Sequence, residues 1–415
     1  MSGLDPGNGW GACLSLIRLF PTPLQPLQLP PPLLAQSTPP EERLENTACP
    51  FPPSTMDIVL EVFDTFIADR IYANVLPLTP SMLAFSGVND FSTSPNATWS
   101  SLREQGTPAA YKFEPASQYF SVEPSNYAYM SRWSRDNMWR QSVSLFFITW
   151  FFGLFIYFVC AGLSYIFVFD KTTFQHPKYL KNQMKLEIQQ TLRSIPVMSL
   201  LTVPWFVAEV RGYSKIYDSM PADSAWNLGG WYTFLQFPFF VAFTDFCIYW
   251  IHRGLHHSLV YKHLHKPHHK WIMPTPFASH AFHPLDGYAQ SVPYHLFPFL
   301  FPLQKFSYIV LFGFIQIWTV MIHDGEYVAN SPIINGAACH TMHHLYFNYN
   351  YGQFTTLWDR LGGSYRMPNE ELFRRETKMS TEEWKKQTKE SEKIQHEVEG
   401  EDDRSYGAEE TKKVQ

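Results

Sequence analysis

Long runs of apolar residues predict that this chain crosses a membrane several times as helices. Residues 143–169 hold no charged side chain over 27 positions, and a helix needs roughly 20 apolar residues to cross a bilayer. Residues 226–251 are also long enough and hold one charge, Asp245. The segment 194–208 is shorter and includes two prolines, so a kinked span and a re-entrant segment both stay open. Residues 287–322 carry a single charge near their middle, and we interpret them as a hairpin of two apolar segments.

The two ends of the chain differ in composition from this apolar middle. Residues 1–55 are rich in proline, leucine and serine without a periodic pattern, which predicts a disordered leader. An amphipathic pattern begins at Met56 and predicts a helix to about Tyr72, so Met56 is a candidate natural start. Residues 367–415 are charged and poor in apolar side chains, and we expect a solvent-exposed tail that is helical at most.

These patterns predict an all-α integral membrane protein with about four transmembrane helices and a cytosolic helical cap. Between the leader and the charged cytosolic tail we place an N-terminal helix and loop region, 56–140, and a membrane domain, 141–366. Charged residues make up 17% of the chain, less than the roughly 25% of soluble proteins. A net charge of -5 gives no basic surface for nucleic acid. Five cysteines without a pattern imply no disulfide framework.

Fourteen of the 16 histidines lie between positions 252 and 344, and nine of these form three clusters. The clusters are His252, His256 and His257; His265, His268 and His269; and His340, His343 and His344. Residues at i, i+3 and i+4 share one helix face, so each cluster can direct two or three imidazoles at one point. Nine ligands exceed the four of a tetrahedral zinc but suit two metal ions with positions left open for oxygen. We therefore predict a dinuclear site, of iron, although imidazole binds zinc, copper and nickel as well.

Further candidate groups lie around the clusters. His280, His283 and His323 are candidate extra ligands or partners of the ligands. Asp324 could bind a ligating imidazole or relay protons. Asp245 lies about two helical turns before the first cluster, on the same face, where it is either a partner of the ligands or an interface residue. Asp245, His323 and Asp324 are therefore the candidate catalytic residues.

Basic residues indicate how the chain is oriented. Four lysines between 171 and 185 follow the first apolar segment and place that loop in the cytosol. Two further crossings and the hairpin then put the histidine clusters and the C-terminus in the cytosol as well. Three arginines between 132 and 140 oppose this orientation. Lys412 and Lys413 match a dilysine signal for retrieval to the endoplasmic reticulum, which agrees with it.

Basic side chains also interleave with the clustered histidines, at Arg253, Lys262, Lys266 and Lys270. Charges of this kind are typical of a segment beside lipid headgroups. They would equally suit the docking of an acidic electron-carrier domain, because complementary charge speeds encounter. The two interpretations do not exclude each other.

Four segments together resemble one known family. They are His-Arg-Gly-Leu-His-His at 252–257, His-Lys-Pro-His-His-Lys-Trp at 265–271, Thr-Pro-Phe-Ala-Ser-His-Ala-Phe-His-Pro at 275–284, and Cys-His-Thr-Met-His-His-Leu-Tyr-Phe-Asn-Tyr-Asn-Tyr-Gly-Gln-Phe at 339–354. The chain resembles the sterol C5-desaturases of the fatty acid hydroxylase superfamily over roughly residues 140–366. The segment from Met56 to about Pro77 resembles, more weakly, the start of fungal members.

This resemblance implies a multi-pass enzyme of the endoplasmic reticulum membrane with two non-haem irons. Such an enzyme would use O2 to introduce the C5=C6 double bond into an episterol-like Δ7-sterol, taken from the bilayer, on the way to ergosterol. Electrons would come from NAD(P)H through a reductase and cytochrome b5. The nine clustered histidines would be the iron ligands, except that one of the first trio would point elsewhere, because His256 and His257 diverge by about 100° on a helix.

Two other readings of the sequence stay open. Another lipid oxidase of the superfamily, such as a C4-methylsterol oxidase or a sphingolipid hydroxylase, would share the metals but leave an oxygenated product. A non-catalytic membrane metal-binding or transport protein would place its ligands near the bilayer midplane. Here the clusters fall beyond the ends of the predicted spans, which favours an enzyme.

Overall fold

Helices form nearly all of the regular structure in the computed structural model of this chain, which confirms the mostly helical fold that the apolar pattern predicts. The structure describes residues 57–78, 113–325, 331, 333–368, 373 and 380–406. The predicted leader and the dilysine pair lie outside these residues.

Three helices are long and apolar enough to cross a membrane: α6 (Met138–Phe167), α7 (Gln183–Val210) and α8 (Tyr232–Leu255). Helix α6 begins where the Asn137 side chain accepts hydrogen bonds from the first free N–H groups of the helix. Helix α7 continues through both of its prolines. The segment 194–208 therefore belongs to a 28-residue helix, which favours a span over a re-entrant segment.

The apolar segment at 287–322 forms the predicted hairpin. It consists of α11 (Pro284–Leu300), the short strand β2 (Leu303–Gln304) and α12 (Lys305–Met321). Strand β2 pairs in parallel with β1 (Ile216–Tyr217). Each hairpin helix has 17 residues, or about 25 Å at 1.5 Å per residue, which is less than a full crossing. The described residues thus hold three candidate spans and a hairpin of two shorter helices, and the count of about four spans stays a prediction.

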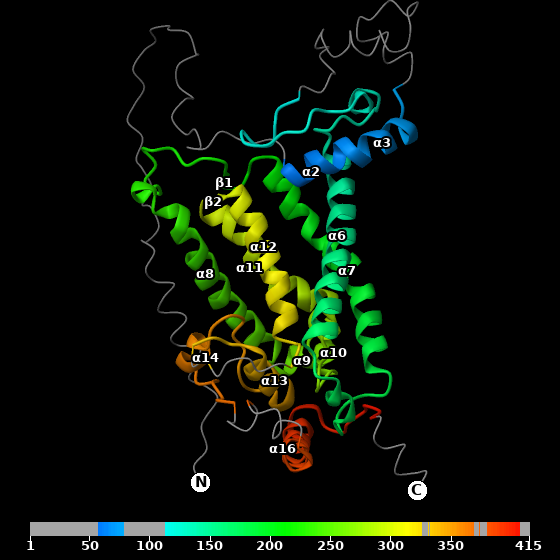
Figure 1. The fold of residues 1–415 in the computed structure, drawn as a ribbon, viewed down its shortest axis with the longest axis vertical. Helices are drawn as coiled ribbons and strands as arrows, with labels where there is room; N and C mark the ends of the chain where they lie inside the picture. The colour runs from blue at the N-terminus through cyan, green and yellow to red at the C-terminus, as the bar shows by residue number, and fades with distance from the viewer. Residues whose placement is uncertain are drawn as a thin grey trace, which may run out of the picture. The chain divides into compact units, whose positions relative to one another are not determined.

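Short helices gather where α8 ends and form the predicted cap (Figure 1). They are α9 (Ser258–Leu264), α10 (Lys266–His269), α13 (Ala337–Tyr346) and α14 (Leu357–Leu361). Single 3-10 turns complete the connections: η4 (Asn126–Tyr129), η5 (Lys171–Gln175), η6 (Leu228–Gly230) and η7 (Pro276–His280). A buried apolar cluster that includes Trp271, Met342 and Leu345 joins the segments that carry the second and third histidine clusters.

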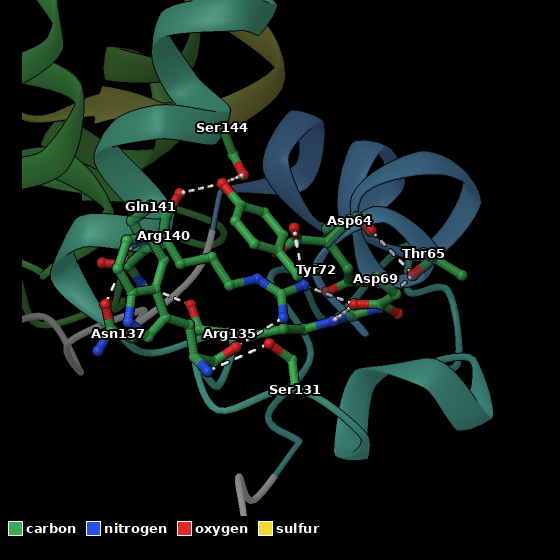
Figure 2. Close-up of polar contacts among 12 residues, drawn as sticks. Asp64, Thr65, Asp69, Tyr72, Ser131, Arg135, Asn137, Arg140, Gln141 and Ser144 are labelled. Atoms are coloured by element: carbon green, nitrogen blue, oxygen red, sulfur yellow. Dashed lines mark hydrogen bonds and ion pairs between the residues drawn. The ribbon is translucent and has the colours of Figure 1, made fainter. Parts of the chain in front are cut away.

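The amphipathic N-terminal helix is present as α2 (Ile58–Phe63), a π-helical turn η3 (Asp64–Ala68) and α3 (Asp69–Val75). Ion pairs tie it to the start of α6, as Figure 2 shows. Arg135 and Arg140 each place a guanidinium nitrogen 2.6 Å from a carboxylate oxygen of Asp69. Arg140 also contacts Asp64 at 3.1 Å, and these side chains are all almost completely buried.

The charged tail differs from the sequence expectation. It forms α16 (Thr381–Glu399), and one side of this helix, including Trp384, Gln387 and Ser391, is buried against the cap. Charge density predicts exposure only when the charges lack partners. Here the buried charge of Glu399 has a partner in Arg404, at 2.6 Å.

Candidate metal centre

Nine of the twelve histidines predicted as ligands meet in two groups. Within each group, one ligand atom from every residue lies within 4.8 Å of the others. The five-histidine group consists of His252, His256, His265, His269 and His343, and the four-histidine group consists of His268, His323, His340 and His344.

Helical geometry explains how the clusters divide between the two groups. His265 and His269, at i and i+4, point to the five-histidine group, while His268 points to the other. In α13 the same spacing places His343 in the five-histidine group, and His340 and His344 in the four-histidine group. Because a helix turns about 100° per residue, the side chain at i+3 points in a different direction from those at i and i+4. One segment can therefore supply ligands to two adjacent groups. The two groups are therefore interlocked through shared segments.

Backbone and carboxylate acceptors orient four of these imidazoles. The Nδ1 of His252 lies 2.9 Å from the carbonyl oxygen of Tyr351, and that of His343 lies 2.7 Å from the carbonyl oxygen of Tyr349. His323 Nδ1 lies 2.7 Å from the carbonyl oxygen of Thr319. A carbonyl can only accept, so each Nδ1 carries the proton and donates it.

The fourth acceptor is Asp286, whose Oδ2 lies 2.8 Å from Nδ1 of His265. Sequence reasoning missed this residue. Its one signal is an acidic residue in the first turn of α11, three positions after His283. A helix start attracts carboxylates for its own dipole, so that signal does not point to a histidine.

The opposite nitrogens face one another at the centre of each group. His252 Nε2 lies 3.1 Å from His265 Nε2, and His340 Nε2 lies 3.0 Å from His323 Nε2. With the proton on Nδ1, the Nε2 atoms of His252 and His265 both present lone pairs. Two lone pairs at this separation repel, and a cation placed between them removes the repulsion. The donor set therefore fits metal ions.

Burial keeps these imidazoles in the form that binds metals. Burial, together with neighbouring imidazoles, lowers the pKa of His269 and His343 well below the usual value. The same causes lower the pKa of His268, His340 and His344 in the other group. Burial lowers the pKa of His323 to about 4. Neutral imidazole is the ligating form, so both groups are ready to bind at neutral pH.

Three predicted ligands lie outside both groups. His257 is exposed, and its side chain caps α9 by accepting from the backbone N–H of Leu259. His283 caps α11 in the same way. His280 lies between Ser279 Oγ, at 3.0 Å, and Gln316 Oε1, at 2.8 Å. These three positions perform local structural tasks in this structure.

Asp245 contacts a loop and not an imidazole. Its carboxylate accepts from the backbone N–H groups of Gln353, Phe354 and Thr355, at 2.7–3.2 Å, and from the Thr355 hydroxyl. The loop follows α13 and includes the carbonyl that orients His252. The second predicted carboxylate, Asp324, is buried directly after His323.

Another carboxylate, which sequence reasoning missed, also holds this loop. Asp359, in α14, accepts from the backbone N–H groups of Tyr351 and Gly352, both at 2.8 Å, and from Ser364 Oγ. Asp245 and Asp359 together therefore fix the position of the Tyr351 carbonyl. Through that carbonyl they act on the orientation of His252.

Comparison with known proteins matches this region and most of the chain. The family model of the fatty acid hydroxylases matches residues 237–364. A Delta(7)-sterol 5(6)-desaturase of Aspergillus fumigatus is 67% identical over 359 residues, covering 86% of this chain and 99% of the relative. One from Leptosphaeria maculans is 62% identical over 366 residues, covering 87% and 100%. One from Candida albicans is 49% identical over 388 residues, covering 85% and 99%. No solved structure matches.

Proposed function

This chain belongs to the Delta(7)-sterol 5(6)-desaturases, and on that premise we propose that its two histidine groups hold two iron ions that serve the desaturation. The reaction is the one for which its relatives are named, the introduction of the 5(6) double bond into a Δ7-sterol in ergosterol biosynthesis. The identities favour this oxidoreductase activity over a C4-methylsterol oxidase or a sphingolipid hydroxylase.

The observation that carries the metal proposal is the pairing of anchored Nδ1 atoms with converging Nε2 atoms. Asp286 and the carbonyl of Tyr351 hold the protons of His265 and His252 on the outer side. The inner nitrogens are then 3.1 Å apart with no proton between them. Nine imidazoles in two groups leave room for open coordination positions, which an oxygen-dependent reaction needs.

Bound iron supplies the redox chemistry that side chains lack, coupling the removal of two hydrogens from C5 and C6 to the four-electron reduction of O2 to two waters. The sterol provides two of the four electrons and two of the four protons that this reduction consumes. A donor must provide the other two electrons and two protons. The protein contributes orientation and exclusion of water. The ring of Phe282 lies 4.4 Å from that of His268, and the ring of Phe347 lies 5.1 Å from that of His269. These aromatic side chains keep the imidazoles in a dry surrounding, where metal charge is felt most strongly.

The experiment that tests the function is sterol profiling in cells that lack their own C5-desaturase. Expression of this chain should convert Δ7-sterols to Δ5,7-sterols, which are recognised by their conjugated ultraviolet absorption. Elemental analysis of the purified protein should find two iron ions per chain. Persistent Δ7-sterols despite expressed, membrane-inserted protein would count against the function, and zinc in an active preparation would count against iron.

We further propose that electrons arrive through cytochrome b5 at the cytosolic face of the cap. Of the four interleaved basic residues, Lys262 and Lys270 are exposed. Lys266 pairs with Asp403 at 3.2 Å, and Arg253 donates to the Gly362 carbonyl. Reversing the charge of Lys262 and Lys270 together should slow reduction by cytochrome b5, with the largest effect at low salt. An unchanged rate would exclude this face.

We also propose that the N-terminal helix lies on the lumenal side of the endoplasmic reticulum membrane and the histidine groups on the cytosolic side. Three arginines before and at the start of α6 oppose this orientation when only charges are counted. Arg135 and Arg140 form buried ion pairs with Asp69 and Asp64. Because these carboxylates neutralise their charge, the two arginines count less against a lumenal N-terminal helix. Protection of an N-terminal tag from protease added outside sealed microsomes would support the proposal, and its digestion would contradict it.

A further inference from the structure

The segment after the family match reaches back to the five-histidine group. The family model ends at residue 364, yet the end of α16 and the residues that follow it contact α9 and α10. Tyr261 Oη donates to Glu399 Oε1 at 2.7 Å, across 138 positions of sequence. Arg404 Nη2 donates to the backbone carbonyl of His269 at 3.1 Å. The tail thus contacts one ligand directly and the neighbourhood of others.

Glu399 and Arg404 are joined to each other in an almost dry position. Arg404 Nη1 lies 2.6 Å from Glu399 Oε2 and its Nη2 lies 3.0 Å from Oε1, so the contact is bidentate. Their side chains are 0% and 2% exposed. A buried ion pair pays a large desolvation penalty and is weak evidence for added stability, whereas it fixes geometry well. A positional role therefore accounts for this pair better than a stabilising one.

Tyr261 carries that geometry to the imidazoles. Its ring lies 5.4 Å from the ring of His256 and 5.8 Å from that of His269. Among the described residues, the Nδ1 atoms of His256 and His269 have no hydrogen-bond partner, unlike those of the other three histidines in the group. The two imidazoles without a hydrogen-bonded acceptor are thus the two that pack closest to Tyr261.

The tail is itself anchored on the far side. Lys178, between α6 and α7, places Nζ 3.0 Å from Glu392 and stacks over the ring of Tyr406 at 4.6 Å. The backbone N–H of Lys181 donates to the carbonyl of Ser405 at 3.2 Å. The end of α16 and the residues after it therefore contact both the α6–α7 connection and the surroundings of the histidine group.

We propose that Glu399 and Arg404 are positioning residues of the metal centre, which hold Tyr261 and the His269 backbone so that His256 and His269 face the five-histidine site. The inference rests on the proposed function, because it assumes that this site binds a metal. It makes the tail a part of the centre, although neither the histidine clusters nor the family match extends into it. Loss of the pair should weaken the five-histidine site and leave the four-histidine site, which Tyr261 does not contact.

The test is metal binding by the full-length protein in detergent, comparing Glu399→Gln and Arg404→Ala with Lys393→Ala. Lys393 is exposed on the same helix and serves as the control. We expect the two variants to lose roughly ten- to one-hundredfold in affinity for one of two irons, as when partners of metal ligands are removed. The iron content of the monodisperse fraction should then fall from two per chain toward one. Lys393→Ala should match the wild type.

A purely structural tail would give a different result. It would lower the unfolding temperature of the metal-free protein while the folded fraction kept its full iron content, and that result would overturn the proposal. Tyr261→Phe provides a milder variant if Arg404→Ala does not fold, since it removes only the hydroxyl and keeps the ring. It should release one iron faster than the wild type, and an unchanged release rate would also overturn the proposal. Wild-type protein that binds no iron would instead contradict the proposed function.

Discussion

Nδ1 of His265 lies 2.8 Å from Oδ2 of Asp286, with both side chains completely buried. A carboxylate partner raises the basicity of a ligating imidazole and fixes its orientation. We expect Asp286→Ala to lose roughly ten- to one-hundredfold in metal affinity, with desaturation falling in parallel. Asp286→Asn keeps an acceptor without the charge, so its metal affinity should lie between those of the wild type and Asp286→Ala. Iron titration of purified protein checks the series, and full affinity in the alanine variant would rule out this role.

Adjacent histidines in the first cluster should behave oppositely. His256 points into the five-histidine group, whereas the exposed His257 only caps α9. His256→Ala should abolish formation of Δ5,7-sterols in cells lacking their own enzyme. His257→Ala should keep the activity and lose about 1 kcal/mol of stability at most, the usual cost of a helix cap. Equal losses from the two variants would show that the division into groups is wrong.

Asp245 should matter through the loop that it holds. Asp245→Ala leaves three backbone N–H groups, one buried and two partly buried, and a hydroxyl without their acceptor, and the free energy of unfolding should fall by about 3 kcal/mol. Activity should fall as well, because the loop sets the Tyr351 carbonyl against His252. Thr355→Val removes only one of these donors and should cost about 1 kcal/mol. Thermal unfolding and desaturation assays of Asp245→Ala and Thr355→Val test this role. If Asp245 instead transferred protons, Asp245→Ala would lose activity while its stability stayed that of the wild type.

The comparison between Asp245 and Asp286 shows what sequence reasoning can reach. Helical spacing was sufficient to predict that two histidines of each cluster reach a common point, but it did not predict that His268 and His343 would each serve a different group from their cluster partners. Spacing also placed Asp245 on the helix face of the first cluster. The face shows where a side chain points, but it does not show which residue the side chain contacts. The neighbour is a loop more than a hundred positions later. The carbonyls of Tyr349 and Tyr351 could not be predicted at all, because every residue has one.

The ion pairs between the N-terminal helix and α6 should stabilise the fold without affecting the metal centre. Arg140→Ala leaves the carboxylates of Asp64 and Asp69 buried with less compensation, and we expect a loss of about 3–5 kcal/mol. Arg132→Ala is the matched control, because Arg132 is exposed, and it should change stability by less than about 0.5 kcal/mol. Denaturation of both variants tests this, while iron content should be normal in the folded protein. Equal stability of the two would show that the buried pairs contribute nothing.

His176 should make the packing of the tail sensitive to acid. Burial, together with the charge of Lys178, lowers the pKa of His176 to about 4, and its ring lies 5.4 Å from that of Trp384 in α16. An unfolded histidine titrates near 6.5. Because the folded pKa is the lower one, the contribution is complete above about pH 6.5 and is lost as the pH falls toward 4, at most about 3 kcal/mol.

Replacing this histidine isolates its contribution. His176→Asn keeps an acceptor for the backbone N–H of Lys178 and cannot titrate. Unfolding of the wild type and the variant should therefore be compared between pH 4 and 7. The stability difference should vary with pH over this range, and parallel curves would contradict the assignment.

The tail shows a second limit of prediction from composition. Its charges indicated exposure, yet Glu399 is buried because Arg404 and Tyr261 reach it from two directions. Partner identity depends on the fold around the segment, which local composition does not contain. The same applies to α7, where two prolines left a kinked span and a re-entrant segment both open, and the structure has one helix that runs through both of them.

The dispersal of the metal centre along the chain has a consequence for biosynthesis. His252 emerges from the ribosome early, but the carbonyl that orients it belongs to a residue 99 positions later. The three long helices can therefore enter the membrane well before either histidine group is complete. If the two histidine groups hold metal as proposed, the metal would be loaded after translation of the membrane domain, into a protein that is already inserted. A chain interrupted before His343 would lack a histidine of each group, so added metal could not complete either proposed site.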